Sequence, residues 1–342
     1  MKKKKRILVA MSGGVDSSVA AALLKNGGYD VAGIFLDLGQ FNLKESLKGA
    51  KKTAEKIGIP LKILDLRKQF KKEVIDYFIK GYENGITPNP CVKCNKQIKF
   101  GLLLKLMKKW KYDCLSAGHY IRLQRNLKSQ ISNLKMAKDK TKDQSYFLYN
   151  LKKGQLGKLL FPLGNYTKEK IKKMADGRKL PYLKKESQDI CFLTGGHNDY
   201  LKKNIKLKKG KIITVDGKII GEHQGLPLYT IGQRHGFSKG GGIPYYVVSK
   251  NLKKNFLIVA SKIDEEKYYK KEIKIRNINW ISGNPPAGGK IYKARIRYRQ
   301  GLQSCRIKGT KVIFTKPQRA VTPGQSLVIY KGQELIGGGI II

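Results

Sequence analysis

The sequence is poor in acidic residues, in cysteine and histidine, and in long apolar runs. Of 342 residues, 24 are Asp or Glu against 71 Lys or Arg, and the net charge is +47. The five cysteines and four histidines lack the spacing of a disulfide framework or a closed zinc site. No apolar run approaches the ~18–20 residues of a membrane helix, and the basic start lacks the cleavage site of a signal peptide. These absences predict a cytoplasmic protein with no membrane partner.

The positive charge comes almost entirely from lysine, since the chain has 59 Lys and 12 Arg. A net charge of this size attracts polyanions, of which nucleic acid is the obvious candidate. A genomic bias towards lysine is an equal alternative explanation for the excess.

Short apolar segments alternate with segments of helical apolar spacing up to about residue 200. Units of this size indicate a doubly wound parallel sheet with helices on both faces. The predicted strands are 6–11, 31–36, 61–66 and 114–118, and the predicted helices are 15–24, 45–57, 71–82, 99–110 and 167–176.

After residue 210 the sequence changes to short alternating segments rich in glycine, which are typical of β structure. Asp216-Gly217 between two such segments predicts a hairpin. Further strands are expected at 245–249, 256–260, 292–298, 305–307, 311–314 and 326–330. The fold class expected is α/β, with a small central mostly-β domain and a C-terminal β-barrel. The lysine-rich runs near the changes in pattern suggest domains at 1–203, 204–268 and 269–342.

The segment Ala10-Met-Ser-Gly-Gly-Val-Asp-Ser-Ser18 follows the first strand and opens the first helix. Its glycines allow close approach of an anion, and the helical N–H groups and serine hydroxyls can bind phosphate oxygens. Asp16 in such a site is a candidate Mg²⁺ ligand or helix cap. The pattern differs from Walker A and from G-x-G-x-x-G. It resembles the pyrophosphate loop (PP-loop) of the ATP pyrophosphatase superfamily, whose members adenylate a substrate oxygen.

Two cysteine segments are candidates for sulfur chemistry. In the first, a helix is expected to begin near Asn95, which would place Cys94 near a helix N-terminus beside lysines and favour its thiolate. In the second, Cys191 lies in a loop just before the change in sequence pattern. Cys114 and Cys305 are expected to be small buried core residues.

These segments occur in one order with several others: N-P-C-x-x-C-N-x-x-I-K-F (89–100), A-G-H-Y (117–120), K-D-Q-S-Y-F-L (142–148), F-P-L-G (161–164), S-Q-D-I-C-F (187–192), G-L-P-L-Y-T-I-G-Q-R-H-G (225–236), G-G-I-P-Y-Y-V-V (241–248) and R-Y-R-Q (297–300). Together they resemble the tRNA-specific 2-thiouridylase family over nearly the whole chain. The family's layout is an ATP-binding domain like the adenine nucleotide alpha hydrolases, a small central domain and a C-terminal β-barrel. It agrees with the changes of pattern described above.

The resemblance implies that ATP adenylates the C2 oxygen of the wobble uridine in tRNAs, with Lys, Glu and Gln acceptors favoured. Sulfur then replaces that oxygen, giving 2-thiouridine, AMP and pyrophosphate. Cys94 is implied as the nucleophile and Cys191 as the persulfide carrier, joined by a disulfide after each turnover. A cysteine desulfurase or a sulfur-relay protein would supply the sulfur. ATP, with Mg²⁺ at Asp16, would lie against Ala10, Met11, Ser12, Gly13, Gly14, Val15, Asp16, Ser17, Leu36 and Gly118.

The resemblance also implies an RNA-contacting set, and His119 beside it is expected to be structural or RNA-facing rather than a general base. Arg295, Arg297 and Arg299 alternate in sequence, so a strand would place them on one face, as suits a phosphate backbone. Cys91 occupies a position where many members have Asp, so a carboxylate role is unavailable there. The segment after Phe35 is also shorter than is usual in the family. The implied contacts to the target base are Asn89, Pro90 and Cys91, and those to tRNA are Lys142, Asp143, Gln144, Arg297, Tyr298 and Arg299.

Alternatives remain open at this stage. Cys91, Cys94 and Cys191 could hold a [4Fe–4S] cluster with one open iron that delivers sulfide in the same reaction. Another adenylating tRNA-modifying enzyme of the superfamily, or a non-catalytic RNA-binding protein with a relic nucleotide site, would share the loop and the charge. The intact loop and two distant cysteines favour the sulfurtransferase.

Overall fold

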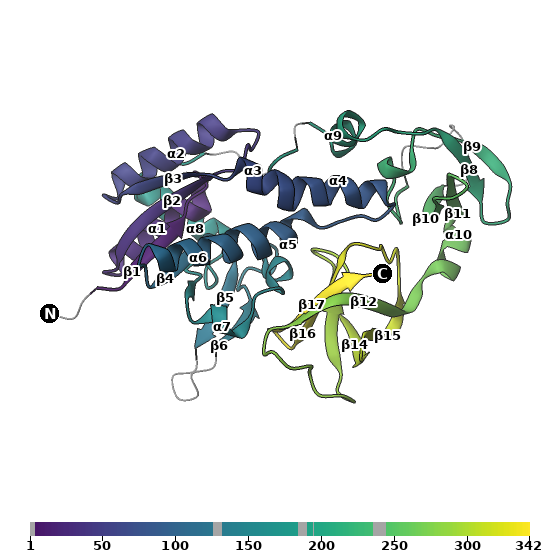
Figure 1. Ribbon diagram of the computed structural model, residues 1–342. Helices are drawn as coiled ribbons and strands as arrows, with labels where there is room; N and C mark the ends of the chain where they lie inside the picture. The colour runs from purple at the N-terminus through teal and green to yellow at the C-terminus, as the bar shows by residue number, and fades with distance from the viewer. Residues whose placement is uncertain (1–3, 126–131, 184–189, 194, 235–243) are drawn as a thin grey trace.

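The computed structural model describes residues 4–125, 132–183, 190–193, 195–234 and 244–342. A parallel sheet with helices forms one end of the molecule, a small four-stranded sheet forms the other, and a barrel lies below the connection between them (Figure 1). None of the helices in these ranges is long and apolar enough to cross a membrane.

The N-terminal part contains a five-stranded parallel sheet, as predicted. Its order is β3-β2-β1-β4-β7, and the strands are β1 (Arg6–Ala10), β2 (Asp30–Asp37), β3 (Leu61–Asp65), β4 (Cys114–Ala117) and β7 (Leu159–Leu160). Ile7 and Val9 pack with residues of α1 and α2 on one face, whereas Leu8 packs with residues of α6 on the other. Because both faces are covered, the three middle residues of the central strand, Ile7-Leu8-Val9, are apolar and buried.

Helices flank this sheet close to where the sequence predicts them. They are α1 (Val15–Asn26), α2 (Leu43–Lys56) and α8 (Lys168–Gly177), and the short helix α7 (Lys153–Leu156) was not predicted. A longer helix is built from α3 (Arg67–Phe70), a π-helical turn (Lys71–Ile75) and α4 (Asp76–Glu83). Another is built from α5 (Pro90–Cys94), a π-helical segment (Asn95–Leu102) and α6 (Leu103–Lys109).

The start of the α5 helix corrects the expectation that this helix begins near Asn95. It begins at Pro90, and Asn89 is its N-cap, with the Asn89 side chain accepting a hydrogen bond from Val92 N at 3.2 Å. Proline at the first helical position and asparagine before it are both favourable at a helix start. Cys94 therefore lies in the second turn.

A hairpin that the sequence did not predict connects the N-terminal part to the barrel. Strands β5 (Ile121–Arg125) and β6 (Ser132–Met136) pair with each other, and β6 pairs with the barrel strand β17 at Lys135 and Glu334. Met136 N also donates to Gln333 O at 2.9 Å. One continuous sheet therefore spans both parts of the chain.

The central part is a four-stranded sheet of order β10-β11-β8-β9. Its strands are β8 (Gly210–Thr214), β9 (Ile219–His223), β10 (Tyr245–Asn251) and β11 (Phe256–Ser261), flanked by α9 (His197–Asn204) and α10 (Lys262–Glu265). The predicted hairpin at Asp216-Gly217 is confirmed by the antiparallel β8–β9 pairing.

The C-terminal part is a closed six-stranded barrel, since β12 pairs with both β15 and β17. The strands are β12 (Lys270–Trp280), β13 (Tyr292–Arg295), β14 (Gln303–Lys308), β15 (Lys311–Gln318), β16 (Ser326–Lys331) and β17 (Glu334–Ile341). The predicted domain boundaries, which stay predictions, fall at the end of α9 and just before β12.

The predicted strand 292–298 is too long. β13 ends at Arg295, and Arg299 has φ +65°, a left-handed conformation incompatible with a continuing strand. The expectation that Arg295, Arg297 and Arg299 share one strand face is therefore wrong.

The barrel interior generates a stability prediction. Leu327 is fully buried in the barrel core, whereas Ile263 on α10 is 84% exposed. Leu327→Ala should lower the free energy of unfolding by about 2–5 kcal/mol through lost transfer energy and a cavity. Ile263→Ala should change it by less than about 0.5 kcal/mol. Denaturant titration measures both, and equal effects would contradict this packing.

Candidate active site

The phosphate loop lies between β1 and α1, at the carboxyl edge of the parallel sheet. Gly14 is the N-cap of α1 and carries no side chain to cap the helix. Ser12 N donates to Ser17 Oγ at 3.1 Å, and Ser17 Oγ donates to Gly14 O at 3.0 Å. Gly13 has φ +79°, and a Cβ there would lie 2.0 Å from Ser46 O. The loop is thus a glycine-dependent turn whose helical N–H groups point towards an anion site.

The other predicted nucleotide contacts surround this loop. Met11 is buried and donates its N–H to Ile34 O at 2.8 Å, so the loop is attached to β2. Leu36 is 9% exposed and lies one residue before the end of β2. A Cβ on Gly118, which follows β4, would lie 2.8 Å from Ser17 N. The structure brings Ala10–Ser17 and Gly118 together, with Leu36 on the neighbouring strand.

Asp16 has partners that the sequence did not reveal. Lys168 Nζ on α8 lies 2.7 Å from both carboxylate oxygens, and the Tyr120 hydroxyl donates to Oδ1 at 2.7 Å. Lys168 is 12% exposed and Asp16 33% exposed in their side chains. A Mg²⁺ ion at Asp16 would therefore have to share this carboxylate with a lysine. The A-G-H-Y motif containing Tyr120 was the available signal for this contact.

Cys94 is buried, which corrects the expectation of a thiolate favoured by a helix N-terminus. The residue is 7% exposed and belongs to the main core cluster, and burial raises the pKa of its thiol to about 12. Lys99 opposes this effect through its positive charge. Desolvation outweighs the helix and lysine effects, so Cys94 is a neutral thiol in this state.

Cys191 lies on the surface beside the loop that follows β2. Its carbonyl accepts a hydrogen bond from Phe41 N at 3.4 Å, and the residue is exposed. The adjacent Phe192 is buried, with ring centroids 5.7 Å from Phe70 and 5.3 Å from Phe78. Nearby protein atoms desolvate the Cys191 thiol and raise its pKa, again opposed by Lys99. The packing of the Phe192 ring thus holds the neighbouring exposed residue Cys191 in place.

The two cysteines are neighbours in space. A charge on Cys191 would raise the pKa of Cys94, and Lys99 acts on both thiols. Lys99 follows Cys94 by five residues within a π-helical segment, whose i→i+5 hydrogen bonds bring such residues over one another. Both thiols are free in this structure.

His119 is also close enough to Lys99 for the lysine charge to lower its pKa. It is 8% exposed, its ring packs against Phe100 and Phe161, and burial lowers its pKa well below the usual value. His119 is therefore a neutral core residue rather than a charged group at neutral pH.

The segment Asn89-Pro90-Cys91 lies where all three parts of the chain meet. Just before it, Thr87 N donates to Pro323 O at 2.9 Å, and Gln325 Nε2 donates to Thr87 O at 3.0 Å. Thr87 also contacts Thr230 of the central part. Asn89 lines a cavity of about 130 Å³ with Lys93, Lys96, Tyr149, Asn277 and others, between the α5 helix and the barrel.

The three cysteines of the iron–sulfur alternative do not form a ligand set. In the ranges that the structure describes, which include Cys91, Cys94 and Cys191, no three His, Cys, Asp or Glu side chains are grouped so that they could hold a metal ion. The residues present therefore do not fit a cluster.

Comparison with known proteins shows the family of the chain. Family models match residues 5–195 (tRNA methyl transferase HUP domain), 198–261 (tRNA methyl transferase PRC-barrel domain) and 270–341 (aminomethyltransferase beta-barrel domain). The tRNA-specific 2-thiouridylase MnmA of Syntrophomonas wolfei is 40% identical, over 98% of this chain and 99% of its own. That of Halothermothrix orenii is 43% identical, over 98% of each chain. The chain belongs to the tRNA-specific 2-thiouridylase family.

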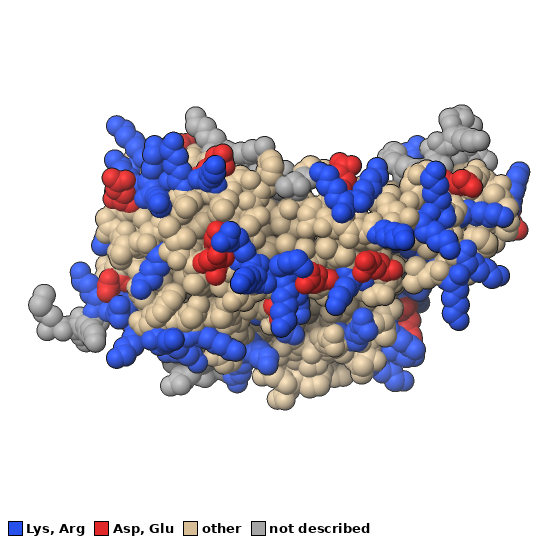
Figure 2. All heavy atoms as spheres, turned by 45° about the horizontal axis from the view of Figure 1, so that its top comes forward, with Lys and Arg blue, Asp and Glu red and all other residues tan. Residues whose placement is uncertain are grey.

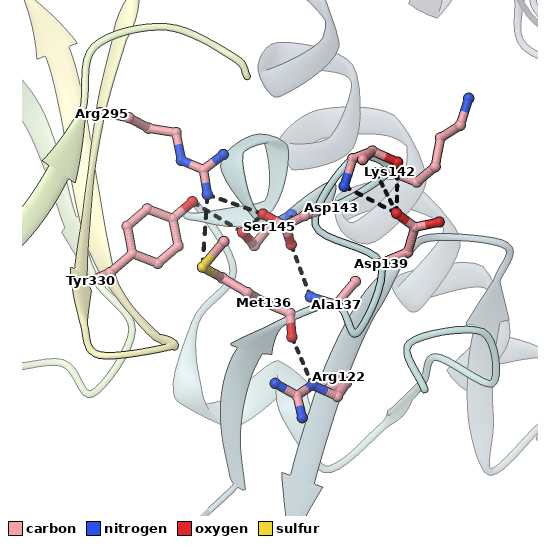
Figure 3. A network of polar contacts seen from close by, with 10 residues as sticks. Arg122, Met136, Ala137, Asp139, Lys142, Asp143, Ser145, Arg295 and Tyr330 are labelled. Atoms are coloured by element: carbon pink, nitrogen blue, oxygen red, sulfur yellow. Dashed lines mark hydrogen bonds and ion pairs between the residues drawn. The ribbon is translucent and has the colours of Figure 1, made fainter. Parts of the chain in front are cut away.

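Two of the predicted RNA contacts are engaged inside the protein. The Asp143 side chain is fully buried, and its Oδ2 lies 3.1 Å from Arg295 Nη2, itself 5% exposed (Figure 3). Gln144 Oε1 accepts a hydrogen bond from Tyr120 N at 2.9 Å. Lys142 is half-buried, and its side chain extends away from the Arg295 network in Figure 3.

The barrel contacts expected from the 2-thiouridylase resemblance lie on a turn. Arg297 donates from Nη2 to Ala320 O at 2.9 Å, and the Arg299 Cζ atom lies 5.2 Å from the centroid of the Tyr298 ring. Arg297 and Arg299 are exposed. Lys and Arg side chains are spread over the face shown in Figure 2 and outnumber the acidic side chains there. This surface suits a polyanion.

Gly118 provides a test of the phosphate loop. Gly118→Ala would place a methyl group against the backbone of the first turn of α1 and should raise the Kd for Mg-ATP about tenfold or more. Gly177→Ala is the matched control, because a Cβ there meets nothing within 4 Å. Calorimetric titration with Mg-ATP measures both, and unchanged affinity in Gly118→Ala would contradict the placement of the nucleotide.

The burial of Cys94 predicts slow alkylation. Because burial raises the pKa of the Cys94 thiol from the usual 9.0 to about 12, the thiolate fraction at pH 8 falls about a thousandfold on folding. Cys94 should therefore react with iodoacetamide about a thousandfold more slowly in the folded than in the unfolded protein. Because folding raises the pKa of Cys94, the contribution of this thiol to the free energy of unfolding is present below pH 9. It is lost as the pH rises towards 12, since the unfolded protein loses the thiol proton more readily than the folded protein. Time-resolved peptide mass mapping measures the rate, and equal labelling in both states would contradict the burial.

Proposed function

We propose that this protein catalyses ATP-dependent 2-thiolation of the wobble uridine of tRNA, giving 2-thiouridine, AMP and pyrophosphate. The observation that carries the proposal is that Cys191 is close enough to Cys94 for its charge to raise the pKa of Cys94, in a chain that has a PP-loop sequence and whose relatives are named tRNA-specific 2-thiouridylases. The positive charge of the molecule supports an RNA substrate.

In this proposal the phosphate loop binds ATP, with Mg²⁺ at its phosphates. The N–H groups at the start of α1 and the Ser12 and Ser17 hydroxyls face the phosphate oxygens. The uridine C2 oxygen attacks the α-phosphorus and pyrophosphate leaves. Adenylation is needed because a carbonyl oxygen is a poor leaving group, whereas AMP is a good one.

The unequal exposure of the two cysteines supports their separate roles. Cys191 is exposed, so a cysteine desulfurase or a sulfur-relay protein can place a persulfide on it. Cys94 is buried beside it, where water and donor proteins have little access. Loss of the Cys94 proton produces the thiolate, which is stabilised by Lys99.

Sulfur transfer then completes the reaction. The Cys94 thiolate attacks the inner sulfur of the Cys191 persulfide and forms a Cys94–Cys191 disulfide. The outer sulfur leaves as hydrosulfide with the bonding electron pair, attacks C2 and expels AMP. Direct attack of the persulfide on C2, followed by disulfide formation, gives the same products. A thiol reductant must reduce the disulfide before the next turnover.

RNA would reach this site from the junction of the three parts of the chain. Asn89, Pro90 and Cys91 are proposed to contact the target base, and Lys142, Arg297, Tyr298 and Arg299 to contact tRNA. The accessible cations in this set suit phosphate contacts. The tRNAs for Lys, Glu and Gln are the proposed substrates.

The assay is nucleoside mass spectrometry of unmodified tRNA after incubation with the protein, Mg-ATP, a sulfide source and a reductant, without oxygen. Wobble 2-thiouridine in the Lys, Glu and Gln acceptors is the expected product. Cleavage of ATP to AMP with no thiolated nucleoside would show that a different tRNA modification is the reaction.

Cysteine variants test the roles within that assay. Cys94→Ser and Cys191→Ser should each lower the rate of thiolation by at least about a hundredfold, because each removes a group that forms a covalent bond. Both should retain tRNA binding. Cys305→Ala, buried in the barrel core, is the control and should retain activity. Thiolation at the normal rate in either serine variant would contradict the assignment.

A further inference from the structure

The K-D-Q segment joins the barrel to the phosphate loop through its two inner residues. Asp143 contacts the barrel residue Arg295, and Gln144 contacts Tyr120, whose hydroxyl reaches Asp16 in the first turn of α1. These contacts form a continuous polar path from β13 to the nucleotide site.

At the Asp143 end of the path the carboxylate is buried, and both of its oxygens accept hydrogen bonds. Asp143 Oδ1 accepts hydrogen bonds from Ala137 N at 3.0 Å and Ser145 N at 3.3 Å, and Oδ2 accepts one from Ser145 Oγ at 2.7 Å (Figure 3). Ser145 Oγ lies 3.0 Å from the hydroxyl of Tyr330, which belongs to barrel strand β16. A carboxylate with this many internal partners has no free face for RNA.

Arg295 makes two further contacts besides the ion pair with Asp143. Its guanidinium carbon lies 4.9 Å from the ring centroid of Tyr330, and Nη2 lies 3.8 Å from the sulfur of Met136 on β6. Its side chain is 5% exposed. Removal of one member of such a buried pair would leave the other charge buried and uncompensated, which would weaken the docking of the two surfaces.

The Gln144 end of the path controls the position of Tyr120. Gln144 N donates to Tyr120 O and Gln144 Oε1 accepts from Tyr120 N, both at 2.9 Å. Tyr120 is 2% exposed and packs with Val15 and Val19 of α1. Its hydroxyl is therefore fixed against Asp16 by backbone contacts on one side and core packing on the other.

We propose that Asp143 and Gln144 are positioning residues that set Tyr120 and Asp16 at the nucleotide site from the docked barrel, rather than residues that contact RNA. The inference rests on the proposed function and deepens it, since it makes the RNA-binding barrel part of the ATP site. Spatial continuity alone does not establish coupling, so the test measures coupling directly.

Two variants break the path at different points. Tyr120→Phe removes the hydroxyl that reaches Asp16 and keeps the ring. The pair Asp143→Asn with Arg295→Met removes both buried charges together, so that neither is left unpaired. Each should raise the Kd for Mg-ATP about tenfold and lower kcat for ATP cleavage by a similar factor, with the Kd for tRNA changed less than about threefold.

Two control variants separate this effect on Mg-ATP binding from a general loss of stability. Tyr166→Phe makes the same chemical change elsewhere in the core that contains Tyr120. Asn279→Ala removes a different contact between the barrel and the N-terminal part, since Asn279 donates to Tyr149 O at 2.7 Å and Leu151 O at 2.9 Å. Asn279→Ala should lower Tm but leave the Kd for Mg-ATP unchanged.

A double-mutant cycle gives the decisive result. If the path acts as a unit, Tyr120→Phe should have a smaller effect on the Kd for Mg-ATP in the Asp143→Asn, Arg295→Met background than in the natural sequence. Additive effects, or weakened tRNA binding with normal Mg-ATP binding, would overturn the inference. Absence of 2-thiouridine from the unaltered protein would instead overturn the proposed function, and the Mg-ATP cycle would still decide the inference.

Discussion

The buried ion pair between Asp143 and Arg295 is the contact on which the arrangement of the molecule depends. Both side chains are almost fully inaccessible, and two further contacts cross the same boundary, from Ser145 Oγ to the Tyr330 hydroxyl and from Arg295 to the sulfur of Met136. Burial of two charges stabilises a structure only when the geometry satisfies them, so the pair strongly specifies one relative placement of barrel and parallel sheet. The β6–β17 pairing extends the barrel sheet into the N-terminal part and supports the same placement.

That placement brings the start of the helix that carries Cys94 against the C-terminal barrel. The turn before α5 is hydrogen-bonded to the loop between β15 and β16 of the barrel, so the helix that carries Cys94 begins against the C-terminal part. Cys191 is anchored from the other direction by the packing of Phe192 against the α3–α4 helix. Cys94 is a buried, neutral thiol and Cys191 an exposed residue, so tertiary packing gives the two cysteines different surroundings.

The phosphate loop is similarly incomplete by itself. Its carboxylate is held by Lys168 and Tyr120, which come from α8 and from the segment after β4. Asp16 is already ion-paired with Lys168, and this contact joins the loop to α8. The site therefore combines a local anion-binding turn with charges supplied by distant parts of the chain.

Local patterns in the sequence determined the β1–loop–α1 unit, the parallel sheet and the hairpin at Asp216-Gly217, because turn residues and apolar spacing act over a few positions. They also identified Cys94 and Cys191 as the reactive pair to consider. Local patterns did not predict the burial of Arg295 and Asp143. These two charged residues lie 152 positions apart in the sequence, and the fold buries them as an ion pair. Local patterns failed likewise for the state of Cys94, whose pKa depends on desolvation by residues far away in the chain. Contacts and burial of this kind are properties of the packed molecule, so tertiary structure alone decided them.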